Sequence, residues 1–108
     1  MHKLFARKLG RLIRWADKNS VHVELIEVFR TAEEQAAYYA AGKSTKDGVH
    51  NLSKHQLGRA ADLVVFKCGM PVWERCKEYE QLGAIWKQWG GRWGGDWQSL
   101  NDIYHFEV

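Results

Sequence analysis

The stretch SKHQLGRAAD, residues 53–62, decides how this 108-residue chain is organised. His55 stands seven residues before Asp62, and Gly58 between them lets the chain turn so that both side chains point at one place. The run over residues 60–66 begins with small residues, continues with apolar and β-branched ones, and predicts a buried strand. We therefore expect Asp62 near the start of a strand, with His55 on the loop that leads into it.

A second stretch, DIYHFE at residues 102–107, brings another histidine close to the last residue. His105 is expected on a short final strand that neighbours the first, and Asp102 precedes it by three residues. Zinc in a catalytic site keeps three protein ligands and leaves its fourth position to water. The two stretches predict such a centre with His55, Asp62 and His105 as ligands. Asp102 is then a nearby carboxylate that can serve as a base.

Length and composition are those of one globular domain over residues 1–108. Hydrophobic residues make up 45% and charged residues 27%, which argues against disorder. No stretch approaches the roughly 20 apolar residues that span a bilayer. Charges interrupt the N-terminus before an apolar run of about 7–15 residues, so we expect no signal peptide and synthesis in the cytoplasm.

The charge is uneven along the chain. Residues 1–18 carry six Lys or Arg and one Asp, which gives this segment a charge of +5. Because the whole chain has a net charge of +3, residues 19–108 sum to −2. Apolar residues recur there at helical spacing and predict an amphipathic helix over about 3–19 that covers a sheet. Its basic side suits a weak contact with an anionic membrane or cell-wall surface. Because the excess of basic over acidic residues is confined to residues 1–18, no nucleic-acid partner is expected.

The remaining segments predict an α+β fold. Residues 21–29 predict a second strand, and a capping box at residues 31–34 starts a helix that Gly42 ends. Residues 43–54 are expected to form a loop beside the zinc centre. We expect about three helices packed on a small, mostly antiparallel sheet.

The third helix is expected to begin just after Pro71. It carries an apolar stripe that we interpret as core, formed by Trp73, Cys76, Tyr79, Leu82, Trp86 and Trp89. Cys68 and Cys76 do not form a CxxC pair, and we expect both to be reduced, buried thiols.

The motif SxHxxGxAxD at residues 53–62, followed by DxxHF at residues 102–106, resembles the LAS zinc metallopeptidases. Within that group the chain looks most like the D-Ala-D-Ala carboxypeptidase branch, which includes the phage and bacterial L-alanyl-D-glutamate endopeptidases. FRTAEEQ at residues 29–35 is similar to the family's Arg-Ser/Thr-x-x-x-Gln stretch, and GGDW at residues 94–97 is similar to the segment before the last ligand in the endopeptidases. The resemblance runs from about residue 24 to the C-terminus.

This resemblance implies the same zinc ligands and places the catalytic carboxylate at Asp102. Glu107 is a rival base by proximity. Arg30 would steady the oxyanion or a substrate carboxylate, although a salt bridge at a strand end is the alternative. Ser53 would orient its neighbours through hydrogen bonds, and Gln35 would line the substrate groove.

The resemblance further implies that Zn²⁺ is the cofactor and that a peptidoglycan stem peptide is the substrate. The expected activity is that of an L-alanyl-D-glutamate endopeptidase, an endolysin that acts as a monomer on the cell wall after release from the cytoplasm. The alternatives are a D-Ala-D-Ala carboxypeptidase that trims stem peptides and a non-catalytic, zinc-containing module that binds the wall.

Overall fold

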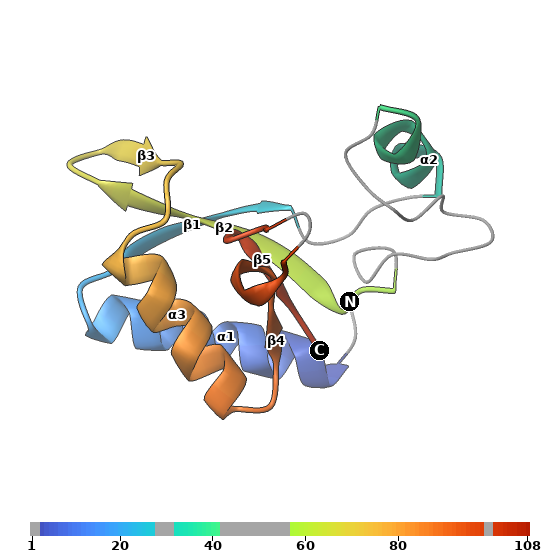
Figure 1. Cartoon of the computed structure of the whole chain (residues 1–108). Coiled ribbons are helices and arrows are strands. Elements are labelled where there is room, and N and C mark those ends of the chain that lie inside the picture. The colour runs from blue at the N-terminus through green and yellow to red at the C-terminus, as the bar shows by residue number, and fades with distance from the viewer. Residues whose placement is uncertain (1–2, 28–31, 42–56, 99–100) are drawn as a thin grey trace.

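The computed structural model describes residues 3–27, 32–41, 57–98 and 101–108. The strands described there form one antiparallel sheet in the order β1-β2-β5-β4, with β3 paired to β2 as well. Helices α1 and α3 lie together on one side of this sheet, and α2 lies away from them (Figure 1). The α+β class and the antiparallel sheet are confirmed. The elements are α1 Lys3–Lys18, β1 His22–Glu27, α2 Ala32–Ala40, β2 Ala60–Lys67, β3 Met70–Val72, α3 Lys77–Gln88, β4 Arg92–Trp93, the 3-10 helix η1 Gly94–Asp96 and β5 His105–Glu107.

Helix α1 matches the expected amphipathic helix. Its buried residues are Phe5, Leu9, Leu12 and Ala16, which recur every three or four positions as one helical face requires. The Phe5 ring meets Trp86 of α3 edge-on at 6.0 Å, so the two helices share one aromatic core. The apolar face of α1 is therefore used for packing against the rest of the domain.

Strand β2 is the centre of the sheet. One of its edges pairs with β1, and the other is shared by β5 at the start of the strand and β3 at its end. Both edges are paired along the strand, and the residues from Ala60 to Val65 are buried except Asp62, which is partly buried. The strand expected over residues 60–66 is thus present and positions Asp62 in the interior of the sheet.

The region around Pro71 differs from the expectation. Pro71 does not open the third helix but lies in β3, opposite Phe66, and α3 begins only at Lys77. A proline lacks the amide donor of an inner strand, so a short edge strand accommodates it well. Trp73 consequently lies outside the helix, with 57% of its surface exposed. The prediction that Trp73 belongs to the core is therefore wrong.

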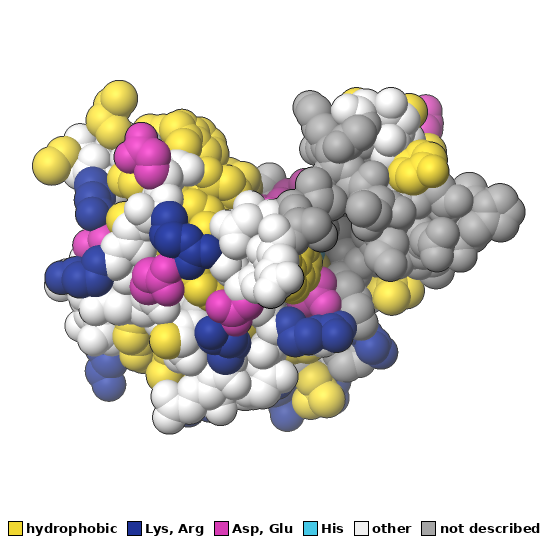
Figure 2. Space-filling view, viewed as in Figure 1, with side chains coloured by type: hydrophobic (Ala, Val, Ile, Leu, Met, Phe, Trp, Pro, Cys, Tyr) yellow, Lys and Arg dark blue, Asp and Glu magenta, His cyan; other side chains and the backbone are white. Residues whose placement is uncertain are grey.

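The two cysteines are free thiols, but Cys68 is exposed in the turn between β2 and β3, contrary to the expected burial. On the face seen in Figure 2, hydrophobic side chains gather over β3, and charges of both signs are interspersed elsewhere. In the part of the chain that the structure describes, no helix is long and apolar enough to cross a bilayer.

Trp93 of β4 is held by very close contacts with glycines. A Cβ added at Gly83 of α3 would lie 2.3 Å from the Trp93 ring, and one added at Gly95 would lie 2.2 Å from it. Such distances exclude any side chain at these two positions while the indole stays in place. The Trp93 ring is buried between them and joins α3 to the last part of the chain.

Two helical glycines make a matched test of this packing. Gly10→Ala in α1 places its Cβ 3.9 Å from the nearest atom, and the better helix propensity should raise the free energy of unfolding by about 0.5–1 kcal/mol. Gly83→Ala is the same change in α3, but overlap with Trp93 should lower that free energy by about 1–3 kcal/mol. Urea denaturation of both variants measures the difference, and equal shifts in the same direction would contradict the packing.

Candidate metal centre

The register between β2 and β5 places Asp62 directly beside His105. Antiparallel neighbours point to the same side of the sheet, with Cβ atoms about 4.5–5.5 Å apart. Backbone bonds continue the pairing at both ends, from the Leu63 N–H to the Tyr104 carbonyl at 2.9 Å and from the Val108 N–H to the Arg59 carbonyl at 3.0 Å. Two residues that are 43 positions apart are thereby fixed together by the sheet itself.

Asp102 joins this pair through the turn that precedes β5. Its N–H donates to the Gly94 carbonyl at 2.9 Å, and its own carbonyl accepts from the His105 N–H at 3.2 Å. The Tyr104 N–H donates to its carboxylate at 3.2 Å. One ligand-type atom each from Asp62, Asp102 and His105 all lie within 4.8 Å of one another.

His105 is buried between carboxylates. Its Nδ1 lies 3.4 Å from Asp62 Oδ1, and its Nε2 lies 2.8 Å from Glu107 Oε1. Burial lowers the pKa of the imidazole, but hydrogen bonds and charge from Asp62 and Glu107 outweigh burial and raise the pKa to about 9. The carboxylates thus favour positive charge at this place.

The donor set fits zinc. Zinc accepts imidazole nitrogen together with carboxylate oxygen, whereas calcium and magnesium prefer sites made of oxygen alone. Asp62 and Asp102 are partly buried and His105 is buried, so the ligand atoms are shielded but not closed off from solvent. The group can therefore bind a transition metal and keep a carboxylate next to it.

Indole groups hold the backbone that carries these side chains. Trp93 Nε1 donates to the Ile103 carbonyl at 2.8 Å, and Trp86 Nε1 donates to the Glu107 carbonyl at 3.0 Å. Both bonds are buried, where leaving an acceptor without its donor costs about 1–3 kcal/mol. The tryptophans of the core thus fix the two ends of the segment that contains His105.

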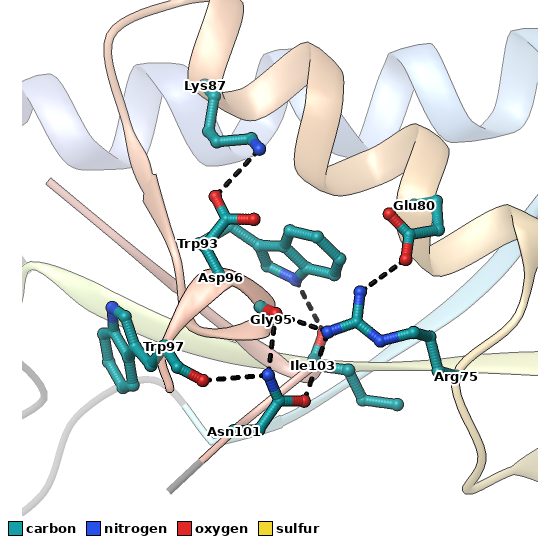
Figure 3. Close-up of polar contacts among 9 residues, drawn as sticks. All are labelled: Arg75, Glu80, Lys87, Trp93, Gly95, Asp96, Trp97, Asn101 and Ile103. Atoms are coloured by element: carbon teal, nitrogen blue, oxygen red, sulfur yellow. Dashed lines mark hydrogen bonds and ion pairs between the residues drawn. The ribbon is translucent and has the colours of Figure 1, made fainter. Parts of the chain in front are cut away.

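A polar network anchors the loop around η1 to α3 and to residue 101 (Figure 3). Arg75 donates to the Gly95 carbonyl and pairs with Glu80, and it also reaches Asn101 Oδ1 at 3.2 Å. The Asn101 amide donates to the carbonyls of Gly95 at 2.8 Å and Trp97 at 2.9 Å. The loop is thereby closed onto the turn that leads to Asp102.

The anchored loop contacts the candidate ligands directly. The Trp97 ring lies 4.9 Å from the His105 ring at a tilt of 47°. A Cβ at Gly94 would lie only 2.4 Å from the Asp102 carbonyl oxygen and 3.0 Å from His105 Cβ. Gly94 is therefore a position where the loop backbone approaches the ligand-bearing turn too closely for any side chain.

The structure brings together only part of the predicted site. Asp62, Asp102 and His105 converge, whereas Arg30, Ser53 and His55 lie outside the described residues. Gln35 belongs to α2, but its side chain also falls outside the described part. The roles expected of these four residues stay predictions.

Sequence reasoning missed the residues that support the site. The sequence indicates Glu107 only as a rival base and does not predict its contact with His105 Nε2. Alternation along the strand places residues 105 and 107 on one face, as expected, but the sequence does not indicate that the Glu107 side chain reaches Nε2. Nothing in the local sequence indicates that Arg75 and Asn101 meet across 26 residues.

Comparison with known proteins agrees with the geometry. The chain is 34% identical over 107 residues to the L-alanyl-D-glutamate peptidase of Listeria phage A118, covering 97% of this chain but only 36% of that protein. It is 26% identical over 122 residues to the peptidoglycan L-alanyl-D-glutamate endopeptidase CwlK of Bacillus subtilis, covering 100% of this chain and 73% of that protein. The chain thus spans about a third of one relative and nearly three-quarters of the other.

A solved structure shows the same fold. The L-Ala D-Glu endopeptidase ChiX of Serratia marcescens superimposes with a TM-score of 0.80 at 26% identity, over 100% of this chain and 80% of that one. The family model described as D-alanyl-D-alanine carboxypeptidase matches residues 46–108, which include both motifs. Because this match covers more than half of the chain, the chain belongs to the D-alanyl-D-alanine carboxypeptidase family of LAS-type peptidases, as its motifs indicated.

Proposed function

We propose that the chain is a zinc-dependent peptidoglycan peptidase that hydrolyses the bond between L-alanine and D-glutamate in the stem peptide. The observation that carries this proposal is the convergence of Asp62, Asp102 and His105 within 4.8 Å in a member of this family. The names of the phage A118 and CwlK relatives support the choice of bond. We also propose that residues 1–108 form a single peptidase domain.

Asp62 and His105 would hold the metal, together with His55 from outside the described residues. The cross-strand pairing keeps the first two at a fixed separation, so the site is preorganised for a cation. A zinc ion bound there supplies Lewis acidity to an attacking water and to the scissile carbonyl.

Asp102 would act as the general base. Its carboxylate lies next to the ligand atoms, and the Tyr104 N–H orients it by donating to Oδ1. In this position it takes a proton from the attacking water and transfers it to the leaving amine. Arg30 would stabilise the oxyanion, Ser53 would orient neighbouring groups, and Gln35 would line the substrate groove.

Two other functions compete. The family description favours a D-Ala-D-Ala carboxypeptidase, which would trim the stem peptide without detaching it from the glycan. A non-catalytic zinc module has no use for a base, and the position of Asp102 beside the ligand atoms counts against it. The GGDW loop and an aspartate as the base favour the endopeptidase, which would act as an endolysin.

We propose that the protein works as a monomer on the cell wall after release from the cytoplasm. Since most of the apolar face of α1 is buried, its exposed side carries mainly charged residues, most of them basic, which are open to an anionic membrane. Such a contact would be electrostatic and weakened by salt.

The first prediction concerns the base. Asp102→Asn should bind zinc but lower the rate of peptidoglycan digestion by about 10²–10⁴-fold, because the amide cannot accept the proton. Elemental analysis measures zinc, and the release of new amino groups from purified peptidoglycan measures the rate. Asp17→Asn, the same change at an exposed position of α1, should leave both unchanged. A normal rate for Asp102→Asn would remove it from catalysis.

The second prediction concerns the bond. Mass spectrometry of fragments from defined peptidoglycan should find stem peptides that begin with D-glutamate and glycan strands that retain L-alanine. Free D-alanine as the product would instead identify the carboxypeptidase. An absence of fragments from zinc-loaded protein would leave the non-catalytic module.

The third prediction concerns Gly94. Gly94→Ala should displace the Asp102 turn, because the new Cβ would lie 2.4 Å from the Asp102 carbonyl oxygen. A displacement of about 1 Å can cost about 10²-fold in rate, so we expect a loss of that order. Gly10→Ala, far from the site, should retain the full rate in the same digestion assay. Equal rates for the two variants would show that the loop does not position Asp102.

A further inference from the structure

Glu107 contacts the ring nitrogen of His105 that faces away from the candidate ligands. Oε1 lies 2.8 Å from Nε2, which is the length of a good hydrogen bond, and both side chains are about nine-tenths buried. The two residues are separated by one position on β5, so strand alternation directs both to the same face of the sheet. The contact is therefore built into the geometry of the strand.

The hydrogen bond at Nε2 determines what Nδ1 can do. A neutral imidazole carries its proton on one nitrogen and a lone pair on the other. When Nε2–H donates to Glu107, the lone pair is left on Nδ1, which lies 3.4 Å from Asp62 Oδ1 and so faces the ligand atoms. Carboxylates that bind a ligand histidine in this way orient the ring and strengthen it as a donor.

Glu107 is itself held from its other side. Arg92 on β4 is its cross-strand partner, and the guanidinium lies 2.9 Å from Oε2. On β2 its partner is Ala60, which is fully buried. Trp86 binds the Glu107 carbonyl, so the backbone is also fixed. One carboxylate oxygen is thus directed to His105 and the other to Arg92.

We propose that Glu107, restrained by Arg92, is a positioning residue that holds His105 in the orientation and tautomer needed to bind the metal through Nδ1. This rests on the proposed zinc site and adds a role for two residues that do not contact the metal. Glu107 therefore acts through His105 and is not the base that the sequence left as an alternative to Asp102.

The experiment measures zinc affinity of the full chain by competition with a chromophoric chelator, without any assay of activity. Glu107→Ala should weaken binding by about 10–100-fold, as removal of such a partner does. Glu107→Gln keeps an oxygen that accepts a hydrogen bond from Nε2–H, so its zinc affinity should fall less than that of Glu107→Ala. The zinc affinity of Arg92→Gln should fall only a few-fold, because Arg92 is 62% exposed and acts through Glu107.

The chain offers a matched control. His22 and Glu24 on β1 form the same contact across one intervening residue, at 3.1 Å, but both are more than half exposed. Glu24→Ala removes a histidine–glutamate hydrogen bond from a strand without touching the candidate site, and it should leave zinc affinity unchanged.

A spectroscopic measurement separates positioning from a general loss of structure. With Co²⁺ in place of zinc, Glu107→Ala should shift the visible absorption bands, because the His105 ring turns relative to the metal. Glu24→Ala should reproduce the unmodified spectrum. If Glu107→Ala binds zinc within two-fold of the unmodified chain and gives the same Co²⁺ spectrum, the proposal is overturned.

The same measurements distinguish failure of the peptidase proposal from failure of the role proposed for Glu107. An unmodified chain that binds no zinc would refute the peptidase proposal and this one with it. An unmodified chain that binds zinc and cleaves peptidoglycan, while Glu107→Ala binds equally well, would refute only the role of Glu107.

Discussion

The pairing of β2 with β5 is the constraint on which the candidate site depends. Backbone hydrogen bonds bring Asp62 and His105 together although they are 43 residues apart. The positions of the two side chains are therefore set by the sheet and not by the side chains themselves. The same register puts Phe106 beside Ala61 and directs both to the core face. A shift of the pairing by one residue would exchange the two faces of β5 and bury the wrong side chains. Packing of the hydrophobic core therefore specifies the register.

Aromatic packing and backbone hydrogen bonding serve the site together. Trp86 and Trp93 fill the core with their rings while their N–H groups bind carbonyls on either side of His105. The same two side chains thus provide apolar burial and local order, which explains why a short domain uses several tryptophans near its end. Because these bonds lie beneath the sheet face that carries the ligands, stability of the core and geometry of the site are coupled.

Much of this could be predicted where the signal is local. Helix α1 follows from its 3.6-residue period, strand β2 from its apolar run, and the meeting of Asp62 with His105 from two spaced motifs. The predicted start of the third helix after Pro71 is wrong because a proline suits both the first turn of a helix and an edge strand. The indole bonds and the Glu107 contact depend on register and reach, which composition and spacing do not encode.

The tight fit of Trp93 between Gly83 and Gly95 limits how relatives of this chain can diverge. A side chain at either glycine would displace the indole and lower stability, and loss of the indole would open a void and release the Ile103 carbonyl. A substitution at any one of the three positions therefore disturbs the packing of the other two. In evolutionary terms, these three residues are expected to be retained or replaced together.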